Sequence, residues 1–379
     1  MPDYKLPLCR PTWGPVERAA INAVLDTGRV TMGEQTALLE AEFAELVGAK
    51  HALFVTSGSA ALLLAAFWLK DHPLGPSRFV VGTPAVTWPT TIWPFMQAGL
   101  MVSLVDIDPE TLVVKEWPDR PFFEAVVPVH LMGNICPHRD DTTNIIEDSC
   151  EELSGRTFKG RIGCYSGYFS HHISTGEGGF VVTNDMATND WLRSARAHGW
   201  ARHSSLEFQA AARSKAPEID PRFLFPQWGF NCKPTDLLAA VGREQLKKLG
   251  PMNTRRVMVF RHWSEALKAG GWAAPMKPTR PDIVPFAFPI ICPDGSTRKR
   301  AVEAFEATGV ETRPIAAGNL LYQPAMLRPD IARMLHMPQF LPGADRVHKC
   351  AFFIGLDGAL TDDDVAWTGD LLRNGPWAQ

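Results

Sequence analysis

The centre of this chain is the segment SGYFSHHISTGEGG at residues 166–179, which leads directly into the apolar run Phe180-Val181-Val182-Thr183. It combines a serine hydroxyl, two adjacent histidines and a glycine-rich turn in front of a short predicted strand. A segment that only fills a core does not need this set of chemical groups. We therefore interpret it as an active-site loop.

The overall charge limits the kinds of partner. The 379 residues include 38 lysines and arginines and 41 aspartates and glutamates, which gives a formal net charge of −3. A balance so close to neutral provides no field that would attract nucleic acid or an acidic membrane. We expect small-molecule ligands and a second copy of the chain as partners.

Neither a membrane span nor a secretion signal is evident. No apolar run reaches the roughly 20 residues that cross a bilayer. The first residues, MPDYK, lack the basic-then-apolar pattern of a signal peptide. We expect a cytoplasmic protein.

The cysteines do not form a ligand pattern. They are scattered, with no CxC or CxxC pair, so we expect neither a metal site nor an iron–sulfur cluster. We interpret them as small buried apolar residues in a reducing compartment. The seven are Cys9, Cys136, Cys150, Cys164, Cys232, Cys292 and Cys350.

The first half of the chain alternates strands with helices. Helical spacing of apolar residues predicts helices at 16–25 and 35–46. Short apolar runs predict strands at 52–55, 79–81, 101–105, 126–129 and 144–148, and a helix is expected before Gly99. This alternation is typical of an α/β fold with a mostly parallel sheet, in which ligands lie beyond the carboxyl ends of the strands.

A candidate phosphate site follows the strand at 52–55. The sequence Thr-Ser-Gly-Ser-Ala-Ala at residues 56–61 places small hydroxyl residues and Gly58 where a strand passes into a helix. Free backbone N–H groups and the helix dipole favour an anion at such a point, although the same residues also serve as ordinary helix N-caps. Gly58, Trp88 and Asp148 all lie at strand ends, so they can converge with the segment at 166–179.

The second half is predicted less regularly. A helix is expected at 191–197, and the polar segment 198–226 shows no clear periodicity. A helix at 236–249 is expected to end at Gly250-Pro251, and another at 255–269 to lead to a smaller α+β part with a strand at 286–291 and a helix at 297–308. We therefore predict a large domain, with an N-terminal arm, at 1–250 and a small C-terminal domain at 251–379.

Pyridoxal phosphate requires the groups found so far: a helix N-terminus for its phosphate, an aromatic side chain for its ring, and a carboxylate for its pyridine nitrogen. The chain resembles the DegT/DnrJ/EryC1/StrS sugar aminotransferase family of fold-type I pyridoxal-phosphate enzymes along nearly its whole length. The motifs that carry this resemblance are TMG at 31–33, SGSAAL at 57–62, VDID at 105–108, ED at 147–148, TGEGG at 175–179, WGFN at 228–231, TD at 235–236, AA at 239–240 and GVETRP at 309–314.

The resemblance implies a seven-stranded, mostly parallel sheet flanked by helices, an aspartate-aminotransferase-like fold, and a homodimer whose subunits share each active site. It also implies roles for individual residues. Gly58, Ser59, Ala60 and Ser166 would hold the phosphate, Asn231 would reach the phosphate of the neighbouring subunit, Trp88 would stack on the ring, and Asp148 would pair with the pyridine nitrogen. Glu151 replaces a usual glutamine that faces the ring oxygen; a plain helix-surface acid is the alternative.

The departure from the family is His171. The family aminotransferases have a lysine at this position, which bonds covalently to the cofactor, and histidine cannot form that bond. Pyridoxal or pyridoxamine phosphate would then be held non-covalently. In this replacement of lysine by histidine, and in the motif HHI…GEGG around it, the chain resembles a subgroup of nucleotide-sugar 3-dehydratases. Because clustered cysteines are missing, the chain resembles the branch that acts on GDP-4-keto-6-deoxymannose without an iron–sulfur cluster and uses L-glutamate as amino donor.

The resemblance thus predicts a 3-dehydratase of 3,6-dideoxysugar biosynthesis. His171 would move protons at the cofactor and at the leaving C3 hydroxyl, for which an ordinary pKa of about 6.5 is suitable. An aminotransferase, a reductase-dependent dehydratase and a non-catalytic cofactor- or nucleotide-sugar-binding homologue are the alternatives. His172 is expected to orient its neighbour by a hydrogen bond or to touch substrate. Arg313 is a candidate for the donor carboxylate or the diphosphate, with a structural salt bridge as the alternative.

Overall fold

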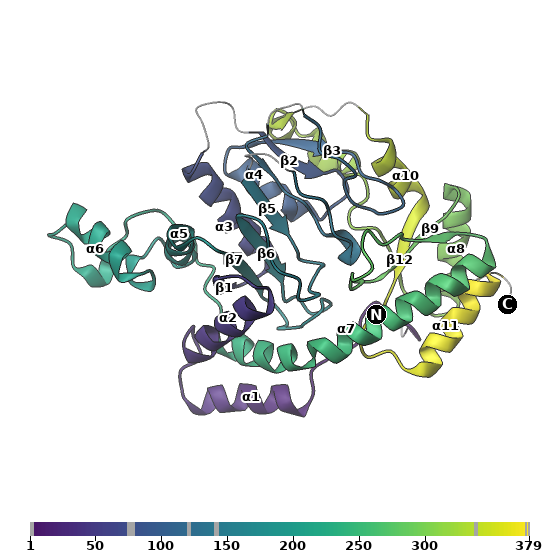
Figure 1. Cartoon of the computed structure of the whole chain (residues 1–379), viewed down its shortest axis with the longest axis horizontal. Coiled ribbons are helices and arrows are strands. Elements are labelled where there is room, and N and C mark those ends of the chain that lie inside the picture. Colours follow the sequence, from purple (N-terminus) through teal and green to yellow (C-terminus); the bar gives the residue numbers. More distant parts are fainter. Residues whose placement is uncertain are drawn as a thin grey trace.

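A computed structural model describes residues 4–73, 80–119, 123–139, 144–336, 340–375 and 377. Its main element is an eight-stranded sheet with the order β1-β7-β6-β5-β4-β2-β3-β11 (Figure 1). The strands are β1 (His51–Val55), β2 (Val80–Pro84), β3 (Met101–Val105), β4 (Ala125–Val126), β5 (Asn144–Asp148), β6 (Ile162–Ser166), β7 (Gly179–Thr183) and β11 (Leu335–His336).

The predicted sheet is confirmed. All strands from β11 to β6 pair in parallel, and β7 lies antiparallel to both β6 and β1. Seven described strands come from the first half of the chain; among them β6 was not predicted as a strand. The eighth, β11, comes from the C-terminal part and pairs with the edge strand β3, which the sequence did not reveal because two residues carry no periodicity. The predicted strand residue Phe79 lies outside the described residues.

Both faces of the large sheet are buried. Along β1, Leu53 and Val55 belong to one apolar core, whereas Ala52 and Phe54 belong to another on the opposite face. This alternation follows from the period of two in a strand. Helix α2 (Glu34–Leu46) covers the second face, where Phe43 stacks on Phe180 with 3.7 Å between ring centroids. Helix α3 (Gly58–Asp71) covers the first face, so the helix with the candidate phosphate site lies directly on the sheet.

The remaining helices surround these layers (Figure 1). None in the described part of the chain is long and apolar enough to span a membrane. The α-helices are α1 (Pro15–Asp26), α4 (Trp93–Gln97), α5 (Met186–Arg196), α6 (Leu206–Lys215), α7 (Asp236–Gly270), α8 (Gly295–Ala307), α9 (Pro329–Ala332), α10 (Pro342–Cys350) and α11 (Asp362–Asn374), and the 3₁₀ turns are η1 (Pro89–Thr91), η2 (Leu131–Gly133), η3 (Ala201–His203), η4 (Pro221–Phe223), η5 (Leu320–Tyr322) and η6 (Pro324–Leu327).

The predicted break at Gly250-Pro251 is wrong. Helix α7 continues through Pro251 for 35 residues in total. A proline inside a helix removes one hydrogen bond and usually bends or ends the helix, but here tertiary packing holds both halves. The first half lies against α1 and α2, and the second against α11. The helix therefore crosses the predicted boundary at residue 250, and that division of the chain stays a prediction.

The C-terminal part contains a four-stranded antiparallel sheet with the order β10-β12-β9-β8. Its strands are β8 (Ala274–Pro275), β9 (Phe288–Ile291), β10 (Thr312–Pro314) and β12 (Ala351–Ile354). The expected strand at 286–291 begins two residues later, at Phe288. The N-terminal arm also reaches this region, because Leu6 N–H donates to the Gly309 carbonyl at 3.0 Å.

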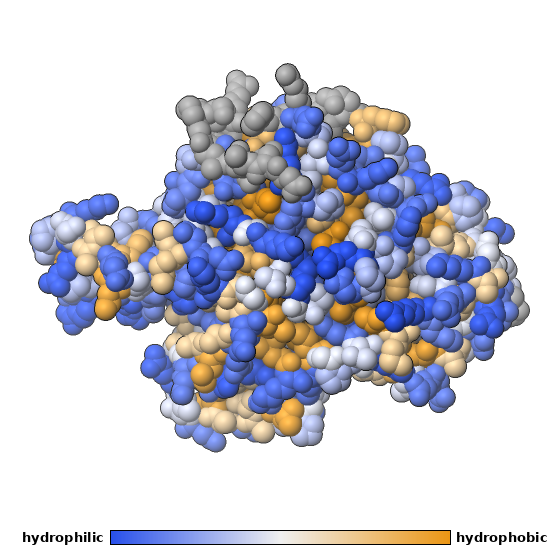
Figure 2. All heavy atoms as spheres, in the orientation of Figure 1, coloured by the Kyte–Doolittle hydropathy of each residue, from blue (hydrophilic) through white to orange (hydrophobic). Residues whose placement is uncertain are grey.

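The segment 198–226 is more ordered than its sequence indicated. It contains η3, α6 and η4 around a small cluster of Ala201, Ala212 and Leu224. It projects from the body at the left of Figure 1, and in Figure 2 apolar and polar side chains are mixed on its surface. A helix that buries so few apolar residues has a weak apolar stripe, which explains why no periodicity was found.

Candidate active site

The N-terminus of α3 forms the base of the candidate site. Ser57 caps the helix by accepting the Ala60 N–H at 3.0 Å, and the Ser59 hydroxyl lies 2.8 Å from that of Thr90. A Cβ atom on Gly58 would lie 2.8 Å from the Cys150 sulfur and 3.0 Å from the Ser166 Cβ. Glycine is thus required by this close approach, which also brings Ser166 beside the first turn. The first N–H groups of a helix lack partners within it, so the turn suits an anion.

The ring-binding residues are joined to this turn by two threonines. Trp88 immediately precedes η1, and its side chain is 62% exposed and free to cover a flat ligand. Thr90 in η1 contacts Ser59, as described above. The next residue, Thr91, donates its hydroxyl to Asp148 Oδ2 at 2.8 Å. This connection places the buried carboxylate of Asp148, at the carboxyl end of β5, beside the turn that carries Trp88.

Glu151 is not a helix-surface acid. It lies in a turn after β5 and its Oε2 accepts the Met132 N–H at 2.8 Å. Met132 has a φ of 55°, in the left-handed region that non-glycine residues rarely adopt. The pKa of Glu151 is raised to about 7, chiefly by burial; the Met132 N–H opposes this rise, and the negative charge of Asp148 adds to it.

His171 is held in one orientation by the backbone. Its Nδ1 lies 2.6 Å from the Cys150 carbonyl oxygen, so Nδ1 carries the proton and Nε2 keeps its lone pair. Tyr168 packs edge-on against the ring, with centroids 6.0 Å apart. Burial lowers the pKa of His171 to about 4; Arg256 lowers it as well, whereas the Cys150 carbonyl opposes the shift. The ordinary pKa expected from the sequence is therefore wrong for this chain.

His172 does not hold His171. It is 2% exposed, and neither ring nitrogen has a hydrogen-bond partner of normal geometry among the described residues, although the Val284 carbonyl is close. Burial, together with Arg256 and His171, keeps its pKa well below the usual range. The hydrogen bond that the orienting role required is thus missing, and Cys150 performs that role instead.

A segment from the C-terminal part closes the site behind the histidines. The Phe286 ring lies 5.0 Å from that of His171 and 6.1 Å from that of His172. Arg256, which is buried in α7, donates to the Phe286 carbonyl at 2.6 Å and also contacts the Leu356 carbonyl. The cation that lowers the pKa of both histidines therefore also fixes the segment that packs on them.

Two predicted site residues lie elsewhere in the single chain. Asn231 is exposed and accepts a hydrogen bond from Lys233. Its neighbour Phe230 packs on Phe67, nine residues along α3 from Gly58 and thus about 14 Å away along the helix axis. Arg313 lies in β10 and forms an ion pair with Glu311 at 2.7 Å. The salt bridge considered for Arg313 is present, and neither residue is joined to the α3 turn.

One further cluster deserves comparison with a metal site. Ligand atoms of His130, His138 and Glu147 all lie within 4.8 Å of one another. However, His130 Nδ1 accepts the Cys136 N–H at 3.1 Å, and its Nε2 lies 3.1 Å from Glu147 Oε2 and also contacts Arg156 Nη2. Arg156 also contacts Glu147. The Arg156 guanidinium thus contacts both ligand residues and provides the positive charge that a metal ion would bring, so the arrangement is that of an ion-pair network.

Sequence reasoning missed several residues of the site: Thr90, Thr91, Cys150 and Phe286. The threonines follow Trp88 and Pro89 directly, so their position at a strand end was an available signal. Cys150 was noted only as a small apolar residue, although it acts through its backbone carbonyl, which no sequence pattern reveals. Phe286 was expected inside a strand rather than in the segment before it.

The residues present fit pyridoxal phosphate. The α3 turn offers N–H groups and two hydroxyls, Trp88 offers a face, and Asp148 has a carboxylate with no cation among the described residues. Together with the sheet order, this site defines a pyridoxal-phosphate-dependent enzyme of fold type I. The chain belongs to the DegT/DnrJ/EryC1/StrS aminotransferase family, whose model matches residues 12–372.

Similar proteins include nucleotide-sugar dehydratases. The chain is 34% identical over 391 residues to GDP-4-keto-6-deoxy-D-mannose 3-dehydratase of Escherichia coli O55:H7, covering 97% of this chain and 99% of that protein. It is 30% identical to dTDP-4-dehydro-2,6-dideoxy-D-glucose 3-dehydratase of Saccharopolyspora spinosa, covering 93% and 82%.

Two solved structures extend this similarity. One is a GDP-4-keto-6-deoxymannose 3-dehydratase in which a histidine is replaced by asparagine, with bound GDP-perosamine; its TM-score is 0.83 at 30% identity, covering 97% of this chain and 100% of that one. The other is the same kind of enzyme with a trapped pyridoxal-phosphate–glutamate geminal diamine, with a TM-score of 0.81 at 29% identity and the same coverage.

Proposed function

We propose that this chain is a pyridoxal/pyridoxamine-phosphate-dependent 3-dehydratase that removes the C3 hydroxyl of a nucleotide-linked 4-keto-6-deoxyhexose, with L-glutamate as amino donor. The observation that carries the proposal is His171. It stands where the family aminotransferases have lysine, and its Nε2 is unprotonated and free to act as a base. The cofactor is then held by non-covalent contacts alone, and the reaction serves 3,6-dideoxysugar biosynthesis.

When bound, pyridoxamine phosphate supplies an amine for the sugar ketone and a ring that accepts electrons. The chain's own residues bind and orient it. The α3 turn, with Ser59 and Ser166, holds the phosphate, and Trp88 covers the ring. Asp148, fixed by Thr91, holds a proton on the pyridine nitrogen. His171 takes a proton at Nε2 while Nδ1 stays hydrogen-bonded to Cys150.

The low pKa of His171 determines how it works. At neutral pH the ring is unprotonated, so it is ready to accept a proton without first losing one. The same low pKa makes the ring a weaker base than an ordinary histidine, but once protonated it readily returns the proton to the departing hydroxyl. Glu151, with a pKa of about 7, is a second group that can exchange protons near neutrality.

The substrate and donor are proposed from the relatives. A GDP-linked sugar is supported by the relative named for GDP-4-keto-6-deoxy-D-mannose and by the related structure that binds GDP-perosamine. Glutamate is supported by the related structure that traps a glutamate adduct. A homodimer is supported by Asn231, which we assign to the partner's site: its neighbour Phe230 packs on Phe67, about 14 Å along α3 from the phosphate turn of its own subunit.

The test is a product analysis with purified protein, pyridoxal phosphate, L-glutamate and GDP-4-keto-6-deoxymannose. We expect ammonia release and a product without oxygen at C3. His171→Asn should lower that rate by about 10³-fold while the cofactor stays bound, as measured by its absorbance after gel filtration. His262→Asn, a change in the outer half of α7, serves as the matched control and should leave the rate unchanged.

His171→Lys sharpens the same test. The lysine restores a covalent anchor, so we expect an aminosugar to replace the deoxygenated product, as judged by mass spectrometry. An aminosugar from the unmodified protein would instead show an aminotransferase. Full dehydration by His171→Asn would refute the role assigned to His171.

A further inference from the structure

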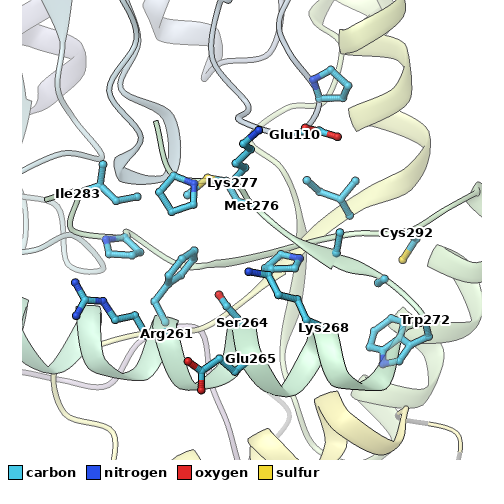
Figure 3. Close-up of a pocket in the computed structure, with 18 of the residues that line it drawn as sticks. Glu110, Arg261, Ser264, Glu265, Lys268, Trp272, Met276, Lys277, Ile283 and Cys292 are labelled. Atoms are coloured by element: carbon cyan, nitrogen blue, oxygen red, sulfur yellow. The ribbon is translucent and has the colours of Figure 1, made fainter. Parts of the chain in front are cut away.

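A concave site lies on the far side of the segment that carries Phe286. It is a groove of about 1050 Å³ between the second half of α7, the turn that enters β8, and the end of β9 (Figure 3). That volume suits a ligand of nucleotide size. Phe260, Met276, Ile283 and Ile291 provide an apolar lining, and Trp272 stands at one end.

Positive charge gathers around this apolar lining. Two acids, Glu110 and Glu265, also line the groove, so its cations outnumber its acids although the whole chain carries a net charge of −3. The lining cations are Arg261, Lys268, Lys277, Arg280 and Arg346.

Three of these cations lack a partner in the part of the chain that the structure describes. Arg280 is paired with Asp282 at 2.8 Å. The side chains of Arg261, Lys268 and Lys277 make no ion pair or hydrogen bond with any residue that the structure describes. Arg261, Ser264 and Lys268 follow one another along one face of α7, and the first and last are about 10 Å apart along the helix axis. The hydrogen-bond donors of these three side chains are thus spread over about 10 Å, which is enough to follow a phosphorylated ligand along the groove.

We propose that this groove binds a nucleoside diphosphate at a site separate from that of His171. The phosphates would pair with the free cations, since guanidinium and ammonium groups are the usual phosphate partners in proteins. The flat base would lie on the apolar lining, which excludes water from it. Neither a purely apolar ligand nor a bare inorganic anion would use both parts of the groove.

The groove is coupled to the histidines by one short segment. Ile283 and Pro285 line the groove, whereas Val284 and Phe286, between and after them, face His172 and His171. A ligand in the groove would therefore contact the same backbone segment whose Phe286 packs against His171. Binding in the groove stands by itself; this effect on His171 rests on the proposed function.

The test is photolabelling of the full-length, cofactor-loaded protein with 8-azidoguanosine 5′-diphosphate, followed by mapping of the labelled peptides by mass spectrometry. We expect label within residues 257–293, in addition to any in the His171 site. Lys268→Glu combined with Lys277→Glu should reduce this label at least about tenfold, since both charges are reversed. Lys247→Glu, on the same helix outside the groove, should leave it unchanged.

Salt provides a second measurement that needs no variant. Labelling of the unmodified protein in the groove should fall steeply between 50 mM and 500 mM NaCl as screening increases, about tenfold or more. Label confined to peptides of the His171 site, or groove label that ignores both salt and charge reversal, overturns the proposal and leaves the dehydratase assignment intact. A change of oligomeric state in the double variant, without loss of label, would also overturn it, because it would assign the groove to a second copy.

Discussion

Two neighbouring carboxylates at the end of β5 have opposite environments. Glu147 is fully buried and accepts hydrogen bonds from the backbone N–H groups of Lys159 and Gly160. It also contacts His130 and Arg156. Burial by itself would raise its pKa, but the hydrogen bonds from His130 and His138, with the charge of Arg156, hold the pKa of Glu147 well below the usual range.

Asp148, one residue later, points to the other face of the sheet. It is 4% exposed, yet its hydrogen bonds come from uncharged groups, the Thr91 hydroxyl at 2.8 Å, the Cys150 N–H at 3.2 Å and the Cys150 thiol, with no cation among the described residues. A buried charge needs a compensating charge. The difference shows that the chain itself supplies cations to Glu147 but none, among the described residues, to Asp148; under the proposed function the cofactor's pyridinium would supply that charge.

The largest expected effect comes from removing the charge of Glu147. Glu147→Gln leaves the partly buried Arg156 with only its longer contact to Glu152, and it leaves the buried donors around Glu147 without a carboxylate, so we expect the free energy of unfolding to fall by about 3 kcal/mol. Urea unfolding followed by circular dichroism measures it. The stabilisation also depends on pH. Because the pKa of Glu147 is lowered in the folded state, the stabilisation is present above the ordinary carboxylate pKa and is lost as pH falls through the pKa of the folded state. A variant as stable as the parent at pH 7 would contradict the comparison.

Asp148→Asn should show the converse pattern. The amide can still accept from Thr91, so we expect unfolding of the cofactor-free protein to change by less than about 1 kcal/mol. Turnover should fall by about 10²–10³-fold, because an amide cannot hold the proton on the pyridine nitrogen. Glu147→Gln should thus mainly lower stability, and Asp148→Asn should mainly lower turnover. If both variants lost the same stability, Asp148 would also be a structural residue.

Glu151 tests a smaller electrostatic effect. Its pKa of about 7 lies above the ordinary value, so the folded state binds its proton more tightly than the unfolded state does. The contribution of Glu151 to the free energy of unfolding should therefore fall as pH rises from about 4.5 to about 7, by about 1–3 kcal/mol. Glu151→Gln should remove this slope. Unfolding midpoints in urea at pH 5, 6, 7 and 8 measure it, and an unchanged slope would show that Glu151 is not the titrating group.

The smallest effect is expected for Thr91→Val. This change removes one hydroxyl that donates to Asp148 while keeping the shape of the side chain. We expect turnover to fall by about tenfold or less, which corresponds to about 1 kcal/mol for one hydrogen bond. Thr87→Val, which removes the hydroxyl that contacts Thr91 at 2.8 Å, is the matched control and should have a still smaller effect.

Local patterns were sufficient for much of this molecule. The period of two and the short apolar runs predicted the parallel strands, because a strand buried on both faces must be apolar throughout. Small residues after β1 predicted the α3 turn. The same rules failed at Pro251, where packing against α1, α2 and α11 outweighs one lost hydrogen bond, and in residues 198–226, where α6 buries too little to show a stripe.

The sequence by itself determined the fold class, the α3 turn, Asp148 and the replacement of lysine by His171, since each depends on residue types at fixed local spacing. Only the tertiary structure decided how these groups are tuned. Burial and Arg256 lower the pKa of His171, and the Cys150 carbonyl selects its tautomer. The opposite faces of β5 likewise separate Glu147 from Asp148. These properties depend on desolvation and on atoms far apart in the chain, which no local pattern of residues contains.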